Sequence, residues 1–125
     1  MMPRCESSAA DMLSVLIVDD NDQIRQLIRF VVTPVAHTIH ECADGAEALA
    51  AVAKHRPDWV LMDVEMPKVD GITALGWIKA AFPSVKVLIV SQYNDQRMRA
   101  AAKVAGADGY VLKENLTEIP RLLTT

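Results

Sequence analysis

Short runs of apolar residues alternate along the chain with segments in which apolar residues recur every three to four positions. The runs are rich in β-branched residues and predict strands, whereas a spacing of i, i+3, i+4 and i+7 is typical of amphipathic helices. Four of the five runs are largely apolar, as expected for strands covered on both faces. The predicted strands are residues 13–18, 36–41, 58–62, 86–90 and 108–112.

A helical segment follows each predicted strand. The third is predicted to begin after Asp70 and to stop at Pro83, the fourth to begin with Asn94 as its N-cap and to end at Gly106, and the last to span residues 116–123. The residues expected on one face are Ile24, Leu27, Ile28 and Val31 in the first helix, Ala46, Leu49, Ala50 and Ala53 in the second, Leu75, Ile78 and Phe82 in the third, and Met98, Ala101, Ala102 and Ala105 in the fourth.

This repeated alternation predicts an α/β fold. Right-handed crossovers between five parallel strands give a flavodoxin-like, doubly wound (βα)₅ arrangement, for which 2-1-3-4-5 is the common strand order. The 125 residues suffice for one domain with its own core. We expect that domain over residues 12–125, after a mobile leader of residues 1–11.

Composition narrows the functional classes. The chain is 51% hydrophobic and 23% charged, typical of a globular protein, and its net charge of −3 argues against direct binding to nucleic acid or anionic lipid. The two cysteines, Cys5 and Cys42, form no disulfide framework. No apolar run is long enough to cross a bilayer, so a cytoplasmic location without membrane contact is expected.

Polar residues gather where the predicted strands end. Asp19 and Asp20 follow the first strand and Asp63 the third, while Ser91 and Lys113 follow the fourth and fifth. Ligands of open α/β sheets bind outside these carboxyl ends, near the switch in strand order. Because the first and third strands are predicted neighbours, the three carboxylates should meet at one edge of the sheet.

Three carboxylates at one place repel one another, and a hard divalent cation with oxygen ligands compensates them best. Mg²⁺ is the expected ion, because it takes one or two carboxylates and leaves room for phosphate oxygens. Lys113 would add a second positive charge. Asp63 stands alone after its strand, whereas Asp19 and Asp20 are adjacent, so we predict Asp63 as a nucleophile towards phosphorus.

Four motifs together resemble the receiver domain of bacterial two-component response regulators. The match covers residues 13–123 in order and spacing. The motifs are VLIVDD at residues 15–20, VLMDVEMPKVDG at 60–71, VLIVS at 87–91 and GADGYVLK at 106–113. The segments SQYND and GYVLKE are most similar to receivers that precede LuxR-type helix-turn-helix domains.

The resemblance implies roles for the acidic residues. Asp63 is the phosphoacceptor, Asp20 and Asp63 bind Mg²⁺ directly, Asp19 acts mainly through water, and the backbone carbonyl of Glu65 is a further ligand. The phosphoryl donor is then a sensor histidine kinase or a phosphotransfer protein. The family resemblance also allows a homodimer, whose interface no sequence feature fixes.

The same resemblance implies a switch. Ser91 and Lys113 contact the phosphoryl oxygens, and Tyr110 turns inward when Ser91 moves, which repacks the fourth helix and fifth strand to control an output domain or partner. One departure stands out, because Gln92 and Tyr93 follow Ser91 where many receivers have a small residue first. This predicts altered access to the phosphoryl group and an altered hydrolysis rate.

Other interpretations remain open at this point. Asp19 and Asp20 could cap a helix, Ser91 could be a plain turn residue, and Tyr110 could serve packing alone. A phosphatase that forms an aspartyl phosphate in passing is one alternative function, although no G-x-G-x-x-G or P-loop motif is present and Glu65 stands where a second aspartate would serve as general acid. A pseudo-receiver that binds partners without phosphorylation is the other.

Overall fold

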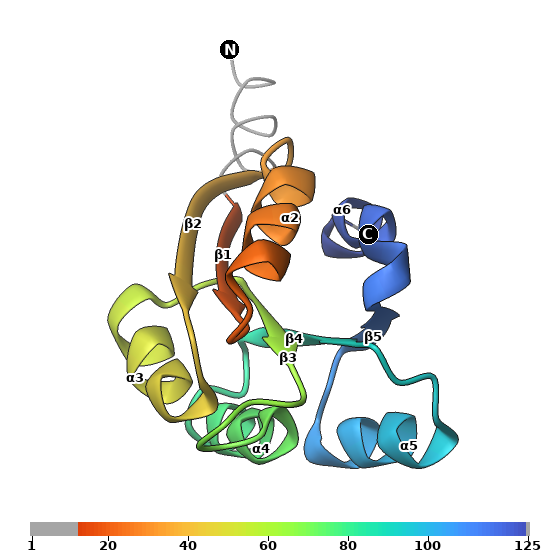
Figure 1. The fold of residues 1–125 in the computed structure, drawn as a ribbon. Helices are drawn as coiled ribbons and strands as arrows, with labels where there is room; N and C mark the ends of the chain where they lie inside the picture. Colours follow the sequence, from red (N-terminus) through yellow and green to blue (C-terminus); the bar gives the residue numbers. More distant parts are fainter. Residues whose placement is uncertain (1–12, 125) are drawn as a thin grey trace.

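A computed structural model describes residues 13–124 and contains one five-stranded parallel sheet. Its order, β2-β1-β3-β4-β5, confirms the predicted flavodoxin-like topology (Figure 1). The predicted leader, residues 1–11, lies outside the described residues. The strands are β1 (Leu13–Val18), β2 (Ala36–Cys42), β3 (Trp59–Asp63), β4 (Lys86–Ser91) and β5 (Gly109–Leu112).

Helices cover both faces of the sheet. The helices α2 and α6 lie on one face, and α3, α4 and α5 lie on the other (Figure 1). The predicted last helix is in fact two pieces, a 3₁₀ helix followed by the short α6, in which Pro120 lies in the first turn. The helices are α2 (Asp22–Val32), α3 (Gly45–His55), α4 (Gly71–Ala81), α5 (Gln96–Ala105), the 3₁₀ helix Lys113–Glu118 and α6 (Ile119–Leu123).

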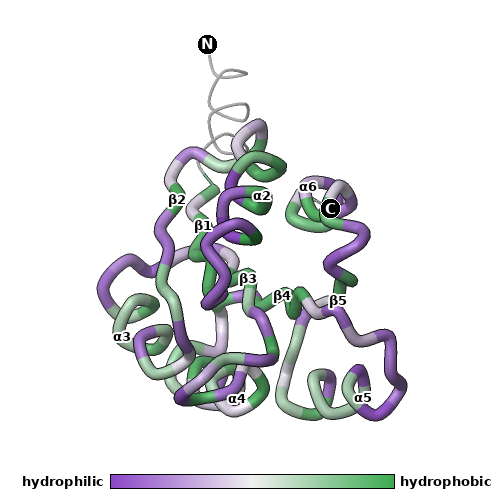
Figure 2. The backbone as a smooth tube through the Cα atoms, viewed as in Figure 1, coloured by the Kyte–Doolittle hydropathy of each residue, from purple (hydrophilic) through white to green (hydrophobic). Residues whose placement is uncertain are grey.

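The core has two layers, one on each face of the sheet, because successive residues of a strand point to opposite sides. The hydrophobic colouring of the central strands reflects this double burial (Figure 2). One layer joins Val15, Ile17, Leu61 and Val90 to Ile28, Val32 and Ile119 of α2 and α6. The other joins Leu16, Val18, Met62 and Ile89 to Val52, Leu75, Ile78 and Ala102 of α3, α4 and α5.

Some predicted helix faces were wrong. In α3 the buried residues are Gly45, Ala48 and Val52, whereas Ala46, Ala50 and Ala53 are exposed. Glycine, alanine or valine occupies seven of the 11 positions of α3, so periodicity alone could not choose a face. For the same reason Ala101 of the alanine-rich α5 is exposed, although Met98, Ala102 and Ala105 pack on the core as predicted. In α2, Leu27 is 52% exposed, whereas Val32, outside the predicted face, is buried.

The helices α2 and α5 begin shortly after the carboxyl ends of β1 and β4, and each has a side-chain N-cap. Asn21, not Asp19 or Asp20, caps α2, and its side chain accepts hydrogen bonds from the backbone N–H groups of Gln23 and Ile24. The helix-cap interpretation of the two aspartates is therefore wrong. Asp95, rather than the predicted Asn94, caps α5. Within residues 13–124, no helix combines the length and the apolar character needed to cross a membrane.

Candidate functional site

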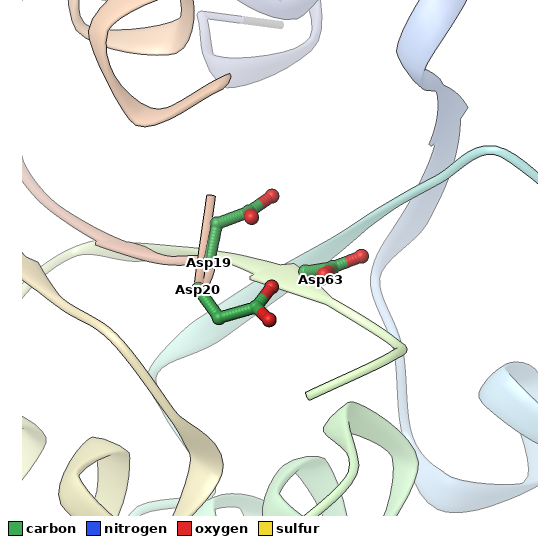
Figure 3. Close-up of side chains that lie close together, drawn as sticks. All are labelled: Asp19, Asp20 and Asp63. Carbon is green, nitrogen blue, oxygen red and sulfur yellow. The ribbon is translucent and has the colours of Figure 1, made fainter. Parts of the chain in front are cut away.

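Asp19, Asp20 and Asp63 converge at the carboxyl edge of the sheet (Figure 3). Carboxylate oxygens of the three residues lie within 4.8 Å of one another. The register explains this meeting, since Val18 of β1 pairs with Met62 of β3 and the next residue of each strand is an aspartate. Asp19 is 1% and Asp63 5% exposed, whereas Asp20 is exposed to solvent.

Lys113 brings one positive charge to this cluster from the end of β5. Its Nζ lies 3.2 Å from Oδ2 of Asp19 and 3.1 Å from Oδ1 of Asp63. Burial, followed by the neighbouring Asp19 carboxylate, raises the pKa of Asp63 to about 6 despite the opposing effect of Lys113. Burial disfavours the ammonium, but the two carboxylates outweigh it and raise the pKa of Lys113. The cluster therefore remains electrostatically unfavourable.

This donor set suits a divalent metal ion. The buried Oδ2 of Asp19 has no hydrogen-bond partner apart from its 3.2 Å ion pair with Nζ of Lys113, an ammonium that it shares with Asp63, so its acceptor capacity is not filled. All the donors are carboxylate oxygens, which Mg²⁺ prefers. Within residues 13–124, this is the only group of three or more potential ligand side chains that meet in this way.

A cavity of ≈ 400 Å³ opens beside the carboxylates and could admit a phosphoryl group. Its walls include the predicted site residues Asp20, Asp63, Glu65, Ser91 and Lys113. Ser91 is the last residue of β4 and is 1% exposed, and its Oγ accepts a hydrogen bond of 3.0 Å from the backbone N–H of Tyr93. The structure thus brings together the residues that the sequence singled out from four strands.

Tyr110 does not line the cavity but contacts Tyr93, which does. It is half-buried on β5, and its hydroxyl donates a hydrogen bond of 2.7 Å to the backbone carbonyl of Tyr93. The guanidinium of Arg99, on α5, lies 4.5 Å from the centre of its ring. Tyr110 therefore connects β5, α5 and the loop that follows Ser91.

Two features of the site could not be anticipated from the motifs. Arg25 of α2 donates a hydrogen bond to the backbone carbonyl of Asp19, and its Nε lies 3.0 Å from Oε1 of Glu41. The ion pair of Arg25 with Asp22 at i, i+3 was a weak signal for this arrangement. In addition, the Tyr93 hydroxyl donates a hydrogen bond of 2.7 Å to Oε2 of Glu65, which joins two loops across the cavity.

Gly71 fixes the distance between α4 and the site. A Cβ at this position would lie 2.0 Å from the backbone oxygen of Asp63, so a side chain cannot be accommodated. The Gly71 N–H donates a hydrogen bond of 2.8 Å to the carbonyl of Val64, and Asp70 caps the helix. The first turn of α4 thereby holds the loop that leaves Asp63.

The sequence has clear relatives. Residues 15–124 match the profile of the response regulator receiver domain. The chain is 35% identical over 115 residues to the transcriptional regulatory protein YhcZ of Bacillus subtilis, covering 90% of this chain and 53% of that protein. It is 34% identical over 104 residues to the transcriptional regulatory protein DegU of Brevibacillus brevis, covering 82% of this chain and 44% of that one. The chain thus spans about half the length of these relatives.

The chain is also similar to solved structures of response regulators. A LuxR-family two-component response regulator from Aurantimonas sp. SI85-9A1 superposes with a TM-score of 0.81 at 29% identity, covering 86% of this chain and 79% of that one. The signal receiver domain of the response regulator NarL from Mycobacterium tuberculosis superposes with a TM-score of 0.83 at 27% identity, covering 89% and 92%. The similarity to LuxR-type receivers is confirmed.

Proposed function

Because this chain belongs to the response regulator receiver domain family, we propose that it is a phosphorylation-dependent switch in which Asp63 accepts a phosphoryl group. The observation that carries this proposal is the position of the Asp63 carboxylate. It lies in a cavity, 3.1 Å from the ammonium of Lys113 and among oxygens of Asp19 and Asp20 within 4.8 Å. A nucleophilic carboxylate beside a cation that can neutralise the phosphoryl oxygens is the requirement for phosphoryl transfer.

The chain's own residues divide the work. A carboxylate oxygen of Asp63 forms the bond to phosphorus while the bond between phosphorus and the donor breaks, and the bonding electrons leave with the donor. Lys113 neutralises charge on the phosphoryl oxygens, and the Ser91 hydroxyl donates a hydrogen bond to one of them. The donor is a sensor histidine kinase or a phosphotransfer protein.

The acidic residues would hold Mg²⁺. Asp20 and Asp63 are the direct side-chain ligands, Asp19 acts mainly through water, and the backbone carbonyl of Glu65 completes the set from the protein. When bound, the ion supplies positive charge that offsets the repulsion among the carboxylates and the incoming phosphoryl oxygens. The unsatisfied Oδ2 of Asp19 and the raised pKa of Asp63 support this assignment.

Phosphorylation then changes the face formed by α5 and β5. Ser91 moves towards the phosphoryl group, Tyr110 follows, and the new packing controls an output domain or partner. The loose packing of α5 supports this step, because Ala102 is its one buried residue, whereas α4 buries Gly71, Ala74, Leu75 and Ile78.

The biological setting follows from the same proposal. The switch acts in the cytoplasm and without direct contact with nucleic acid by this chain. A homodimer is a further proposed assembly of the phosphorylated form. The names of the relatives as transcriptional regulatory proteins support an output in transcription.

Intact mass spectrometry tests the phosphoacceptor. The protein is incubated with Mg²⁺ and acetyl phosphate, and the wild type is compared with Asp63→Ala and Asp58→Ala. Asp58 immediately precedes β3 and Asp63 ends it, so the two variants change the same residue type at opposite ends of one strand. We expect a gain of one phosphoryl group in the wild type and in Asp58→Ala, and none in Asp63→Ala.

Other results would contradict the proposal. Equal gains in all three proteins would remove Asp63 as the acceptor, and no gain in any would favour an interaction module that works without phosphorylation. Rapid release of many equivalents of phosphate would favour a phosphatase.

A further inference from the structure

Asp20, the exposed member of the acidic cluster, depends on its backbone for its position. Within residues 13–124, its side chain has neither a hydrogen bond nor an ion pair. Asp19, by contrast, is held at two points, since its N–H donates to the carbonyl of Cys42 at 3.2 Å and its Oδ1 accepts from the N–H of Asn21 at 2.8 Å. Whatever fixes the backbone before Asp20 therefore decides where this carboxylate lies.

Arg25 of α2 binds this backbone from outside the cavity. Its Nη1 donates to the carbonyl oxygen of Asp19, which belongs to the peptide bond that leads to Asp20. Because a peptide unit is planar, holding this oxygen also fixes the direction in which the chain enters Asp20. Arg25 is not among the residues that line the cavity. Its contact with the site is therefore made through this peptide.

The guanidinium of Arg25 is itself held by two carboxylates. Its Nε lies 3.0 Å from Oε1 of Glu41 on β2, its Nη2 pairs with Asp22, and only 17% of the side chain is exposed. The planar guanidinium places its donors in fixed directions, whereas the ammonium of a lysine is a point charge on a flexible stem. Arg25 thus connects α2 and β2 to the turn that follows β1.

Arg29, one turn further along α2, offers a matched comparison. Its Nε lies 2.6 Å from Oε2 of the same Glu41, and its Nη2 approaches the carbonyl of Ile39 at 3.4 Å. In the described part of the chain, its guanidinium makes no bond to Asp19. The two arginines therefore share residue type, helix and acidic partner, and they differ in the contact with the turn after β1.

We propose that Arg25 is a positioning residue, which holds the peptide between Asp19 and Asp20 so that the Asp20 carboxylate is in place for Mg²⁺. The inference rests on the proposed function, because it concerns the proposed metal site. Groups that orient the ligands of a metal ion change its affinity about tenfold to hundredfold when they are removed. The charge of Arg25 acts in the opposite direction, because a nearby cation repels Mg²⁺. Loss of positioning weakens binding, whereas loss of charge strengthens it.

Calorimetric titration with Mg²⁺ alone tests this positioning. The wild type is compared with Arg25→Lys, Arg25→Met and Arg29→Lys. We expect the Kd of Arg25→Lys to rise about tenfold, because lysine keeps the charge and loses the fixed geometry, and the Kd of Arg29→Lys to stay at the wild-type value. Arg25→Met should also bind more weakly than the wild type. A Kd at or below the wild-type value in both Arg25 variants would overturn the inference, as would equal weakening in Arg29→Lys.

Phosphorylation at increasing Mg²⁺ separates positioning from a general distortion of the site. The gain of phosphoryl mass from acetyl phosphate is followed with time. Arg25→Lys should need about tenfold more Mg²⁺ for half of its maximal rate and should reach the wild-type rate at saturation, because Asp63, Ser91 and Lys113 are unchanged. A lower rate at saturation would overturn the positioning role. A wild type that binds no Mg²⁺ would instead overturn the proposed metal site, and this inference with it.

Discussion

Both edges of the sheet carry aspartates, but only one edge satisfies them. At the amino edge, Oδ2 of Asp58 accepts a hydrogen bond of 2.8 Å from the N–H of Ser14. Oδ2 of Asp108 accepts one of 2.8 Å from Val87 and pairs with Nζ of Lys79 at 3.0 Å. These carboxylates connect neighbouring strands and have partners of their own.

At the carboxyl edge the carboxylates face one another. Asp19 and Asp63 share the single ammonium of Lys113, and Oδ2 of Asp19 has no hydrogen bond. Stability alone would favour the arrangement of the amino edge. The carboxyl edge therefore retains a repulsion that a cation and a phosphoryl group can relieve, and the difference between the edges distinguishes a binding site from a structural contact.

The largest effect should come from removing the cation at the carboxyl edge. Lys113→Met leaves Asp19 and Asp63 buried without a positive partner, and we expect a loss of about 3 kcal/mol in the free energy of unfolding without metal. Lys79→Met, the matched change at the amino edge, should cost about 1 kcal/mol, because Asp108 keeps its bond to Val87. Urea unfolding at pH 7.5 with a chelator measures both, and equal losses would erase the contrast between the edges.

The next largest effect is that the same Asp→Asn change should raise the free energy of unfolding at one edge and lower it at the other. Asp63→Asn removes a charge whose pKa burial and Asp19 raise, so at pH 7.5 without metal it should stabilise the protein by about 2 kcal/mol. Asp58→Asn weakens a satisfied bond to Ser14 and should destabilise it by about 1 kcal/mol. The same urea experiment compares them. If both substitutions destabilised the protein, the carboxylates of the acidic cluster would not repel one another enough to lower its stability.

Magnesium should stabilise the protein by binding at the carboxyl edge of the sheet. At a free concentration ten times its Kd, an ion that binds only the folded state adds about 1.4 kcal/mol to the free energy of unfolding. Thermal melts with Mg²⁺ and with a chelator should therefore differ for the wild type, and much less for Asp20→Asn, which lacks a proposed ligand. Asp58→Asn should respond like the wild type. An equal response of Asp20→Asn would exclude this residue as a ligand.

The smallest effect is a dependence on pH. The pKa of Asp63 is about 6 in the folded protein and near 3.8 in the unfolded chain, so the folded state binds the proton more tightly. Its contribution to stability is full below pH 3.8 and is lost as the pH rises through 6. Between pH 5 and 7.5, without metal, the wild type should lose about 1 kcal/mol more than Asp63→Asn. Parallel pH curves for the two proteins would contradict the raised pKa.

The sequence was sufficient for the topology and for the residues that meet at the carboxyl edge. Strand composition identified all five strands, and parallel pairing alone brings residues 19, 63 and 113 to one edge. Strand ends were less certain, since Asp63 and Ser91 close their strands instead of following them, and Asp58 and Asp108 lie before theirs. Both errors concern single polar residues whose place depends on hydrogen bonds between strands.

The remaining errors concern packing and side-chain pairs. The face of α3 was missed because alanine-rich helices have no strong amphipathic pattern, whereas in α5 only Ala101 was wrongly placed and Met98, Ala102 and Ala105 pack on the core as predicted. The hydrogen bond between the Tyr93 hydroxyl and Glu65 spans 28 positions, and no local signal in a single sequence indicates such a bond. The stacked rings of His40 and His55, with centres 3.5 Å apart, were missed for the same reason.

The close approach of α4 to the site has a consequence for mutational tolerance. A deep mutational scan scored by signalling would normally highlight residues that carry chemistry. Position 71 has no functional group, yet any side chain there would collide with the backbone of Asp63. We therefore expect substitutions at Gly71 to be depleted in such a scan as strongly as substitutions of the aspartates, so that the absence of an atom is as much under selection as the presence of a carboxylate.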